Sequence, residues 1–214
     1  MKKIMIATPS YSGDVSAFYA DSLINTINKV KGGEINITQR FLVYQPVIQY
    51  ARNTLVKQFL ESDNDEIIFI DSDQAWEPDD LISLINSDKD FVGAAVHLKT
   101  HDERYNVKFL NKDIDSEGYL LVDSIGTGFL KISRDAMQKM YDHGSKYLYN
   151  DIEYSSVFEL SVINGQAFTE DFTFCEKWKS LGGKIYIDTN LKSFHIGKDM
   201  WASNIKNYIK EMSL

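Results

Sequence analysis

The sequence has a single cysteine, Cys175, among its 214 residues, which excludes an internal disulfide and any metal site built from several cysteines. No apolar run reaches the length needed to cross a membrane. The apolar run near the start, Ile4 to Ala7, is far too short for a secretory signal peptide. We therefore expect a soluble, cytoplasmic protein with no integral membrane segment and with Cys175 in its core.

The chain is also short of positive charge, with 23 Lys and Arg against 31 Asp and Glu and a formal net charge of −8. An acidic chain does not attract polyanions over its whole surface, so binding of nucleic acid or anionic membranes through bulk charge is disfavoured. Two phosphate-binding signatures are missing as well. The turn from Thr8 to Asp14 has neither the dinucleotide glycine fingerprint nor a phosphate-loop lysine.

What the chain does have is a clear alternation of strand and helix patterns over its first hundred residues. Strand patterns cover residues 3–7, 35–43, 67–70 and 90–96, and helical spacing of apolar residues covers 15–30, 48–59 and 78–85. This order is typical of a parallel sheet covered by helices on both faces. The predicted fold class is therefore α/β, with a Rossmann-like, mostly parallel sheet.

The pattern changes near residue 97, and the second half predicts a mixed sheet. We expect short strands near 107–110 and 119–122, a strand over 129–132, a helix capped by Ser133, an irregular loop over 145–166, a helix capped by Thr169, a strand over 184–188 and a closing helix from 205 to 212. There is no internal repeat and no low-complexity linker. We therefore expect a single domain over residues 1–214.

Two carboxylates, Asp71 and Asp73, come directly after the apolar strand 67–70. Asp is a poor strand residue and is expensive to bury unpaired, so the pair indicates a cation at the end of a core strand. Ligands of open α/β sheets bind at this edge, and Mg²⁺ and Mn²⁺ prefer carboxylate oxygen. The motif predicts a metal-held, phosphate-bearing substrate, while a turn of solvated carboxylates remains the alternative.

Two other functions of the Asp-Ser-Asp motif fit the sequence less well. A phosphotransferase of the haloacid dehalogenase type would use Asp71 as a nucleophile. That motif requires Thr or Val two residues after the second Asp, where this chain has Ala75. It also normally lies on the first strand, whereas here several elements precede it. A calcium loop of the EF-hand type lacks the Gly, Asp or Asn that it needs at the following positions.

The order of the motifs resembles the GT-A-fold glycosyltransferases, in particular the compact family-2-like members of bacteria and phages. The resemblance spans nearly the whole chain and is carried by Thr8-Pro9-Ser10-Tyr11, Ala51-Arg52-Asn53, Phe69 to Asp73, Trp76 to Asp79, Gly126 to Phe129, Glu170-Asp171 and His195. It implies a hexosyl- or pentosyltransferase that moves a sugar from a nucleoside-diphosphate sugar, with UDP favoured, to a hydroxyl acceptor with inversion. It also divides the domain into a nucleotide-binding half, 1–97, and an acceptor and catalytic half, 98–214.

The resemblance further implies roles for the acidic and histidine motifs. Asp71 and Asp73 would hold Mn²⁺ or Mg²⁺ against the diphosphate, and His195 would complete the coordination, although a lone His is more often structural. Asp171, with Glu170 beside it at a helix start, would be the general base. The helix dipole favours the ionised form of both side chains, but acids are also common at any helix start.

The remaining implied contacts surround the donor. Thr8, Pro9, Ser10 and Tyr11 would border the nucleobase and ribose, and Ser72 would lie between the metal-binding carboxylates. Arg52, off the apolar stripe of its helix, would reach the donor or form a surface salt bridge. Gly126-Thr127-Gly128 would allow close backbone approach to the donor sugar or acceptor, and Trp76 would form a wall of the acceptor site.

The acceptor stays open, with a glycan and a hydroxymethylated DNA base as the two candidates. The small size of the chain is phage-like, and a phage enzyme would act in the host cytoplasm. A nucleotidyltransferase is an alternative, but it would need a basic Gly-rich loop after the first strand, where Thr8 to Asp14 has no Lys or Arg. A non-catalytic sugar-nucleotide binding protein would keep the pocket and dispense with the base.

Overall fold

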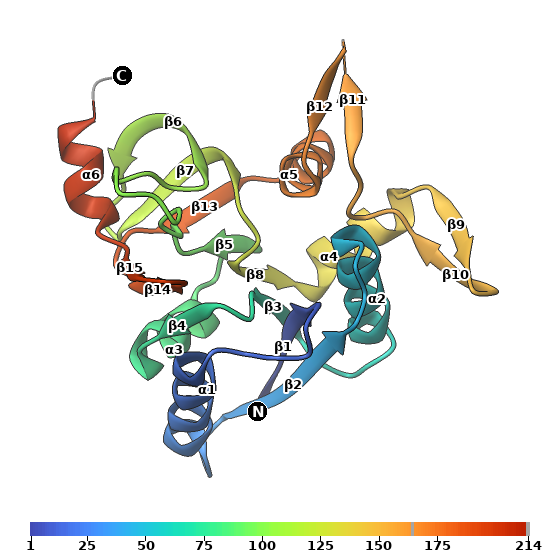
Figure 1. The fold of residues 1–214 in the computed structure, drawn as a ribbon, viewed down its shortest axis with the longest axis horizontal. Helices are drawn as coiled ribbons and strands as arrows, with labels where there is room; N and C mark the ends of the chain where they lie inside the picture. The colour runs from blue at the N-terminus through green and yellow to red at the C-terminus, as the bar shows by residue number, and fades with distance from the viewer. Residues whose placement is uncertain (164, 213–214) are drawn as a thin grey trace.

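The computed structural model describes residues 1–163 and 165–212 and contains one eight-stranded sheet (Figure 1). The strands lie in the order β2-β1-β3-β8-β5-β13-β7-β6. Their bounds are β1 (Lys2–Ser10), β2 (Ile35–Val43), β3 (Glu66–Ile70), β5 (Phe91–Gly93), β6 (Val107–Ile114), β7 (Tyr119–Ile125), β8 (Phe129–Ser133) and β13 (Ile185–Asp188). Strand β8 runs antiparallel between β3 and β5, and β7 runs antiparallel to β13 and β6. The predicted α/β fold with a mostly parallel sheet is confirmed.

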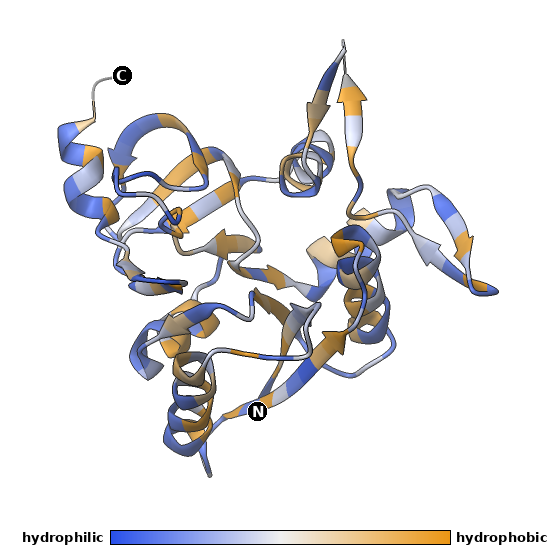
Figure 2. Cartoon of the chain, in the orientation of Figure 1, coloured by the Kyte–Doolittle hydropathy of each residue, from blue (hydrophilic) through white to orange (hydrophobic). Residues whose placement is uncertain are grey.

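Helices cover both faces of this sheet. Helices α1 (Ala17–Val30) and α3 (Pro78–Asn86) pack on one face, and α2 (Ile48–Leu60), α4 (Arg134–His143) and α5 (Glu170–Ser180) pack on the other, with α6 (Ile205–Glu211) at the C-terminal end. The buried strand β1 shows the reason for two faces. Ile4 and Ile6 face the first layer, and Met5 and Ala7 face the second. Figure 2 accordingly shows apolar residues along the central strands.

Within the described residues, seven short strands lie outside the large sheet. Strand β14 (Ser193–Ile196) pairs with β4 (Gln74–Trp76) and β15 (Met200–Ala202). Two hairpins, β9 (Lys146–Tyr149) with β10 (Ile152–Ser155) and β11 (Ser161–Ile163) with β12 (Gln166–Phe168), project from the body of the molecule (Figure 1). No helix among the described residues is long and apolar enough to span a membrane.

The prediction of an irregular loop over 145–166 is wrong, because this stretch forms most of the two hairpins. Asn150 and Asp151 have φ angles of 49° and 61°, and a tight hairpin turn of type I′ needs positive φ at both central residues. Asn and Asp tolerate that conformation better than most residues. The polar composition that suggested a loop therefore reflects the turn, and the tyrosines belong to the strands.

We predict that Phe69→Ala lowers the free energy of unfolding by about 3–5 kcal/mol, because it leaves a cavity in the core. The Phe69 ring is fully buried on β3 and packs edge-on against Phe158 with 5.4 Å between ring centroids. Urea unfolding monitored by circular dichroism measures the change. The matched control is Phe18→Ala on α1, where the ring is 53% exposed and the expected change is within about 0.5 kcal/mol. Equal losses in the two variants would contradict the prediction.

Candidate active site

Arg52 of helix α2 lies at the centre of the candidate site, at the carboxyl end of β3. Its side chain is 5% exposed, and one guanidinium nitrogen, Nη1, donates to Glu170 Oε1 (2.7 Å) and Asp171 Oδ1 (2.6 Å). The other, Nη2, donates to Asp71 Oδ1 at 3.3 Å. One buried cation thus holds three carboxylates from two distant parts of the chain. The surface salt bridge considered for Arg52 is therefore wrong.

Asp171 has one strongly bonded oxygen and one weakly bonded oxygen. Its Oδ1 accepts from Arg52 and from the Thr127 hydroxyl, each at 2.6 Å. Its Oδ2 accepts a longer bond of 3.4 Å from the Asn106 side chain. The carboxylate is thus fixed through Oδ1, while Oδ2 keeps lone pairs for a further partner. The helix α5 that begins at Glu170 presents both acids from its first turn, although Thr169 makes no side-chain capping bond there.

The Gly126-Thr127-Gly128 turn holds Asp171 and Asp71 in place. Thr127 is fully buried and its hydroxyl points to Asp171, so its observed contact is with the acid. A Cβ at position 126 would lie 2.2 Å from the Asn106 amide nitrogen, and one at 128 would lie 3.1 Å from Asp71 Oδ2. The Gly128 carbonyl also accepts from the Asp71 backbone N–H at 3.0 Å. A side chain at 126 would therefore displace the Asn106 amide, and one at 128 would require the Asp71 carboxylate to shift by a few tenths of an ångström.

Asp73 faces away from Arg52, toward Lys99 and His195. The Lys99 ammonium lies 2.5 Å from Asp73 Oδ2, and His195 Nε2 lies 3.4 Å from the same oxygen. Burial opposes ionisation of Asp73, but hydrogen bonds from His195 and Lys99 outweigh it and lower the pKa of Asp73 to about 2. The pairing of β14 with β4 places His195 beside Gln74, next to Asp73 in the sequence.

The orientation of His195 fits a cation between it and Asp73. Its Nδ1 lies 2.8 Å from the backbone oxygen of His97, and a carbonyl oxygen accepts only, so Nδ1 carries the proton. Nε2 is therefore the ring nitrogen that faces Asp73: as N–H it donates to the carboxylate, and as a free lone pair it can share a cation with the carboxylate. A cation satisfies both groups. No group of three or more His, Cys, Asp or Glu side chains among the described residues has an arrangement that could hold a metal ion, so the ligand set remains a prediction.

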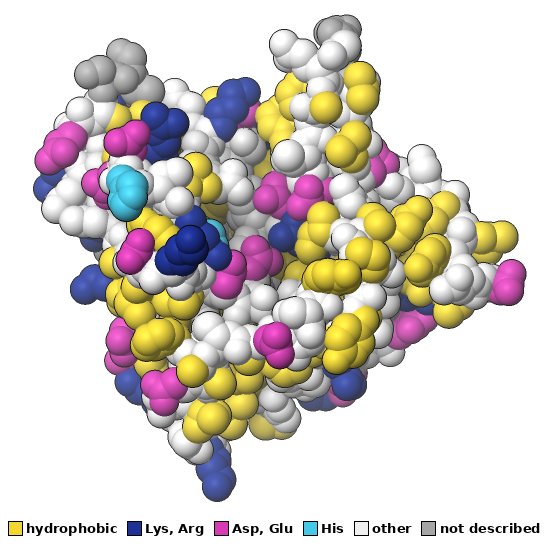
Figure 3. Space-filling view, viewed as in Figure 1, with side chains coloured by type: hydrophobic (Ala, Val, Ile, Leu, Met, Phe, Trp, Pro, Cys, Tyr) yellow, Lys and Arg dark blue, Asp and Glu magenta, His cyan; other side chains and the backbone are white. Residues whose placement is uncertain are grey.

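The charges of the site also favour a divalent cation. Four carboxylates, those of Asp71, Asp73, Glu170 and Asp171, face the two cations Arg52 and Lys99, which leaves two negative charges. Burial raises the pKa of Asp71, Arg52 opposes that rise, and the neighbouring Asp171 and Asp73 add to it. Burial also disfavours the charged form of Arg52, yet the three carboxylates raise its pKa. Figure 3 shows acidic side chains gathered around a hollow on this face.

The donor-side residues predicted at the end of β1 lie at different depths. Thr8 is buried, 2.5 Å from the Tyr19 hydroxyl, and Ser10 is 3% exposed and donates to the Asp14 carbonyl at 2.6 Å. Pro9 is buried as well, whereas Tyr11 is 69% exposed. The Ser72 carbonyl accepts from the Ser16 backbone N–H at 3.0 Å. Of this set, Tyr11 presents most of its side chain to solvent at this edge.

The prediction that Trp76 forms an acceptor wall is wrong. Its side chain lies in the core beneath α1, where the residue is 2% exposed and packs edge-on against Tyr19 with 5.1 Å between centroids. The indole N–H donates to the Thr26 hydroxyl at 3.0 Å. Trp76 is the last residue of β4. The sequence did not predict this strand, because three residues are too few to show a periodic pattern.

Two polar residues of the site were not predicted. Lys99 and Asn106 lie in the segment between β5 and β6, where the sequence shows no regular periodicity. A lysine near a histidine in an irregular segment carries no signal of its own. Cys175, by contrast, is fully buried as expected, and burial raises the pKa of its thiol to about 12.

No family model and no curated protein sequence matches the chain. Among solved structures, A197 from STIV is 22% identical over 92% of this chain and 86% of its own, with a TM-score of 0.58. That likeness shows a shared fold. Drosophila beta-1,4-galactosyltransferase 7, in a mutant complex with manganese, UDP-Gal and xylobiose, is 14% identical over 99% of this chain and 74% of its own, with a TM-score of 0.48. S. aureus TarS with UDP-GlcNAc is 15% identical over 87% of this chain and 56% of its own, with a TM-score of 0.47.

The solved structures similar to this chain thus include glycosyltransferases, and the predicted α/β fold is shared with A197 from STIV. The predicted roles of individual residues rest on the site geometry described above.

We predict that Arg52→Met destabilises the protein by about 3–5 kcal/mol near neutral pH, because it leaves three carboxylates facing one another without a cation. The cost should grow as pH rises above the ordinary carboxylate range. An acid whose pKa is raised on folding binds more protons in the folded state, so the free energy of unfolding falls with rising pH. Removing Arg52 raises the already raised pKa of Asp71 further.

Urea unfolding of wild type and variant from pH 4 to pH 8 measures this effect. The control is Arg134→Met, because Arg134 donates to the backbone carbonyls of Phe59, Leu60, Ser62 and Asn64. That variant should lose stability by a similar amount at every pH. A pH-independent loss in Arg52→Met would contradict the prediction.

Proposed function

We propose that the chain is a glycosyltransferase that moves a sugar from a nucleoside-diphosphate sugar, with UDP as the favoured nucleotide, to a hydroxyl group of an acceptor. The observation that carries the proposal is the meeting of Asp71, Glu170 and Asp171 around Arg52 at the carboxyl end of the central strands, with Asp73 two residues after Asp71. The fold places ligands at this edge. Solved neighbours that bind UDP-Gal and UDP-GlcNAc agree with the choice of donor.

Asp171 is the proposed general base. Arg52 and Thr127 hold one oxygen, Oδ1, so the carboxylate has a fixed direction, and Oδ2 is the oxygen that can accept the proton of an acceptor hydroxyl. Glu170 shares Arg52 and helps to keep the guanidinium in position. Direct attack of the activated hydroxyl on the anomeric carbon, from the face opposite the leaving diphosphate, inverts that centre.

Asp71, Asp73 and His195 are the residues proposed to hold Mn²⁺ or Mg²⁺. Their oxygen and imidazole donors suit these ions, and the two excess negative charges of the site suit a divalent cation. When bound, such an ion supplies positive charge to the leaving diphosphate. Lys99 lies beside Asp73 and is the side chain that would move, or share Asp73, when a cation binds.

The donor side of the proposed enzyme is the half 1–97, with Tyr11 free to stack on the nucleobase. The half 98–214 carries the general base and the acceptor side.

A non-catalytic sugar-nucleotide binding protein is the second function to test, because its pocket would be similar. The first experiment is a screen for hydrolysis of nucleotide sugars in the presence of Mn²⁺ and of Mg²⁺.

We predict that Asp171→Asn reduces donor turnover by about 10²- to 10⁴-fold, since the amide cannot take up the proton. The affinity for the nucleotide sugar should stay within a few-fold of wild type. Release of UDP measures turnover, and isothermal titration calorimetry measures binding. The matched control is Asp135→Asn, an exposed Asp in the first turn of α4, which should leave both quantities unchanged.

Two outcomes would count against the enzyme. Wild-type protein that binds a nucleotide sugar without turning it over, with any acceptor offered, points to the binding protein. Turnover that survives Asp171→Asn removes this residue from the role of base.

We predict that chelation with EDTA abolishes turnover and that Mn²⁺ restores it. Independently of activity, Asp73→Asn should weaken Mn²⁺ binding at least tenfold, and Lys99→Met should strengthen it, because Lys99 competes for the same carboxylate oxygen. Electron paramagnetic resonance of free Mn²⁺ during titration reports both affinities. The control is Lys3→Met, which removes another Lys–Asp pair, that with Asp63, outside the site. Equal Mn²⁺ affinities in all four proteins would refute the assignment.

A further inference from the structure

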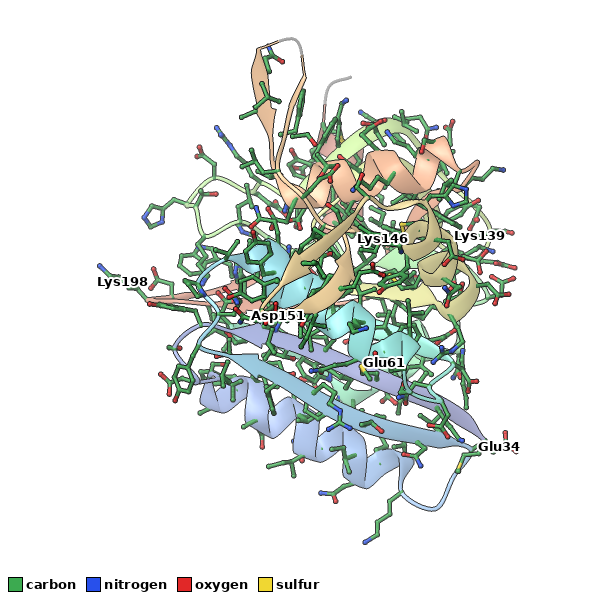
Figure 4. The ribbon with its side chains drawn as sticks, turned by 90° about the vertical axis from the view of Figure 1, so that its right-hand side faces the viewer. Glu34, Glu61, Lys139, Lys146, Asp151 and Lys198 are labelled. Atoms are coloured by element: carbon green, nitrogen blue, oxygen red, sulfur yellow. The ribbon has the colours of Figure 1, made fainter. Side chains whose placement is uncertain are left out.

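A groove with a volume of about 510 Å³ lies beside the acidic cluster, between α2 and the β9–β10 hairpin. Its volume falls in the range of small-ligand sites. Its walls come from the start of α2, from β9 and from the segment after β10, with the lining residues Val47, Gln49, Tyr50, Asn53, Tyr147 and Phe158 among them. We call it the tyrosine groove. Figure 4 shows the hairpin across α2, with Lys146 and Asp151 marking its two ends.

Tyr50 and Tyr147 line this groove, Tyr149 lies next to Tyr50 at its edge, and all three rings remain partly exposed. The ring of Tyr50 lies 4.8 Å from that of Tyr149 and 5.8 Å from that of Tyr147, measured between centroids. Exposed apolar side chains continue this surface, since Leu148 is 72% and Leu160 is 60% exposed. In Figure 3 the apolar patch over α2 and the hairpin begins next to the acidic cluster. The groove and the proposed base therefore open on the same face.

The hydroxyl groups of Tyr147 and Tyr149 can each donate a hydrogen bond to a ligand. Gln45 Nε2 donates to the Tyr149 hydroxyl at 3.2 Å, and Asn53 Nδ2 donates to the Tyr147 hydroxyl at 3.1 Å. A phenol that accepts such a bond keeps its own hydrogen for another acceptor. Flat aromatic faces beside oriented donors match a sugar ring, which presents C–H groups on its faces and hydroxyls on its edge.

The charge of the groove disfavours a nucleic-acid acceptor. Two charged residues line it, Lys146 and Glu159, and they have opposite signs. Glu159 is paired with Lys177 at 3.0 Å, and Lys146 donates to the Tyr141 carbonyl at 2.7 Å. A DNA backbone needs several cations along its path, and this chain has a net charge of −8. An uncharged ligand needs no such compensation.

The groove is connected to the base through consecutive residues of α2. Asn53 bonds the backbone N–H and carbonyl of Phe158 at 2.8 and 2.9 Å, while its neighbour Arg52 bonds Asp171. The Phe158 ring, a wall of the groove, lies 5.6 Å from the Arg52 guanidinium carbon. The Thr173 hydroxyl, two residues after Asp171, donates to the backbone of Glu159. The two neighbouring residues Arg52 and Asn53 of α2 therefore fix the spacing between the groove and the carboxylate of Asp171.

We propose that the tyrosine groove is the acceptor subsite and that the acceptor is an uncharged oligosaccharide, which lies on Tyr50 and Tyr149 with its terminal hydroxyl at Asp171. The proposal rests on the glycosyltransferase function proposed above and selects a glycan over the hydroxymethylated DNA base. None of the proposed metal ligands lines the groove, so binding of an oligosaccharide to it can be measured without donor or metal.

The experiment measures binding of neutral oligosaccharides to the full chain by glycan array, followed by calorimetry with the strongest binder. Tyr149→Ala should weaken that binding at least tenfold, and Tyr147→Phe, which keeps the ring and removes one donor, should weaken it less. Tyr186→Ala, a half-buried tyrosine on β13 outside the groove, is the matched control and should leave binding unchanged. Thermal unfolding of each variant confirms that it is folded.

The kinetic arm uses the same variants. Tyr149→Ala should raise the KM for the oligosaccharide acceptor, whereas Tyr186→Ala should leave both this KM and the hydrolysis of the donor unchanged. Duplex DNA that contains 5-hydroxymethylcytosine is the competing probe. Transfer to this DNA at equal rates in wild type and Tyr149→Ala overturns the proposal while the glycosyltransferase function stands.

The two hypotheses fail in different ways. Oligosaccharide binding that depends on Tyr149, in a protein that turns over no nucleotide sugar, supports the groove as a glycan site and refutes the enzyme. Failure to bind any neutral glycan of the array, in a protein that hydrolyses donors in an Asp171-dependent way, refutes the groove and leaves the enzyme intact.

Discussion

The guanidinium of Arg52 is the interaction on which the rest of the site depends. A buried cation that serves three carboxylates has a large desolvation cost, which the ion pairs must offset together. Asp71 comes from the end of β3 and Glu170-Asp171 from the start of α5, so the arginine joins the first half of the chain to the second. Such a network contributes more to fixed geometry than to stability, and fixed geometry is what a general base requires.

The sheet brings these groups together by its strand order. Strand β8 lies between β3 and β5, and the turn before it, Gly126 to Gly128, therefore reaches the carboxyl end of β3. The pairing of β14 with β4 brings His195 to Asp73 from more than a hundred residues away. The contacts of His195 and of the Gly126–Gly128 turn thus follow from backbone pairings, whereas Arg52 on α2 reaches Glu170 and Asp171 on α5 through side chains alone.

The sequence was sufficient for the class of fold and for the residues that gather, because both depend on local patterns. The apolar strand before Asp71, the helix start at Glu170 and the glycines around Thr127 are visible without tertiary information. The partners of these residues were not predictable. Arg52 lies beside apolar neighbours on α2. Whether its side chain faces solvent or the carboxylates depends on where α5, more than a hundred residues later in the sequence, packs. Lys99, the hairpins and the burial of Trp76 depend on the same distant packing.

The central position of β8 has a consequence for how the chain acquires its structure. When residues 1–97 have left the ribosome, β3 and β5 have no strand between them, and each presents an open edge. The sheet closes only after residue 133 has emerged, and β13 must then add to the far side of β5. Until β8 and β13 are in place, β3 and β5 therefore expose unpaired strand edges, which in general favour misassociation during folding.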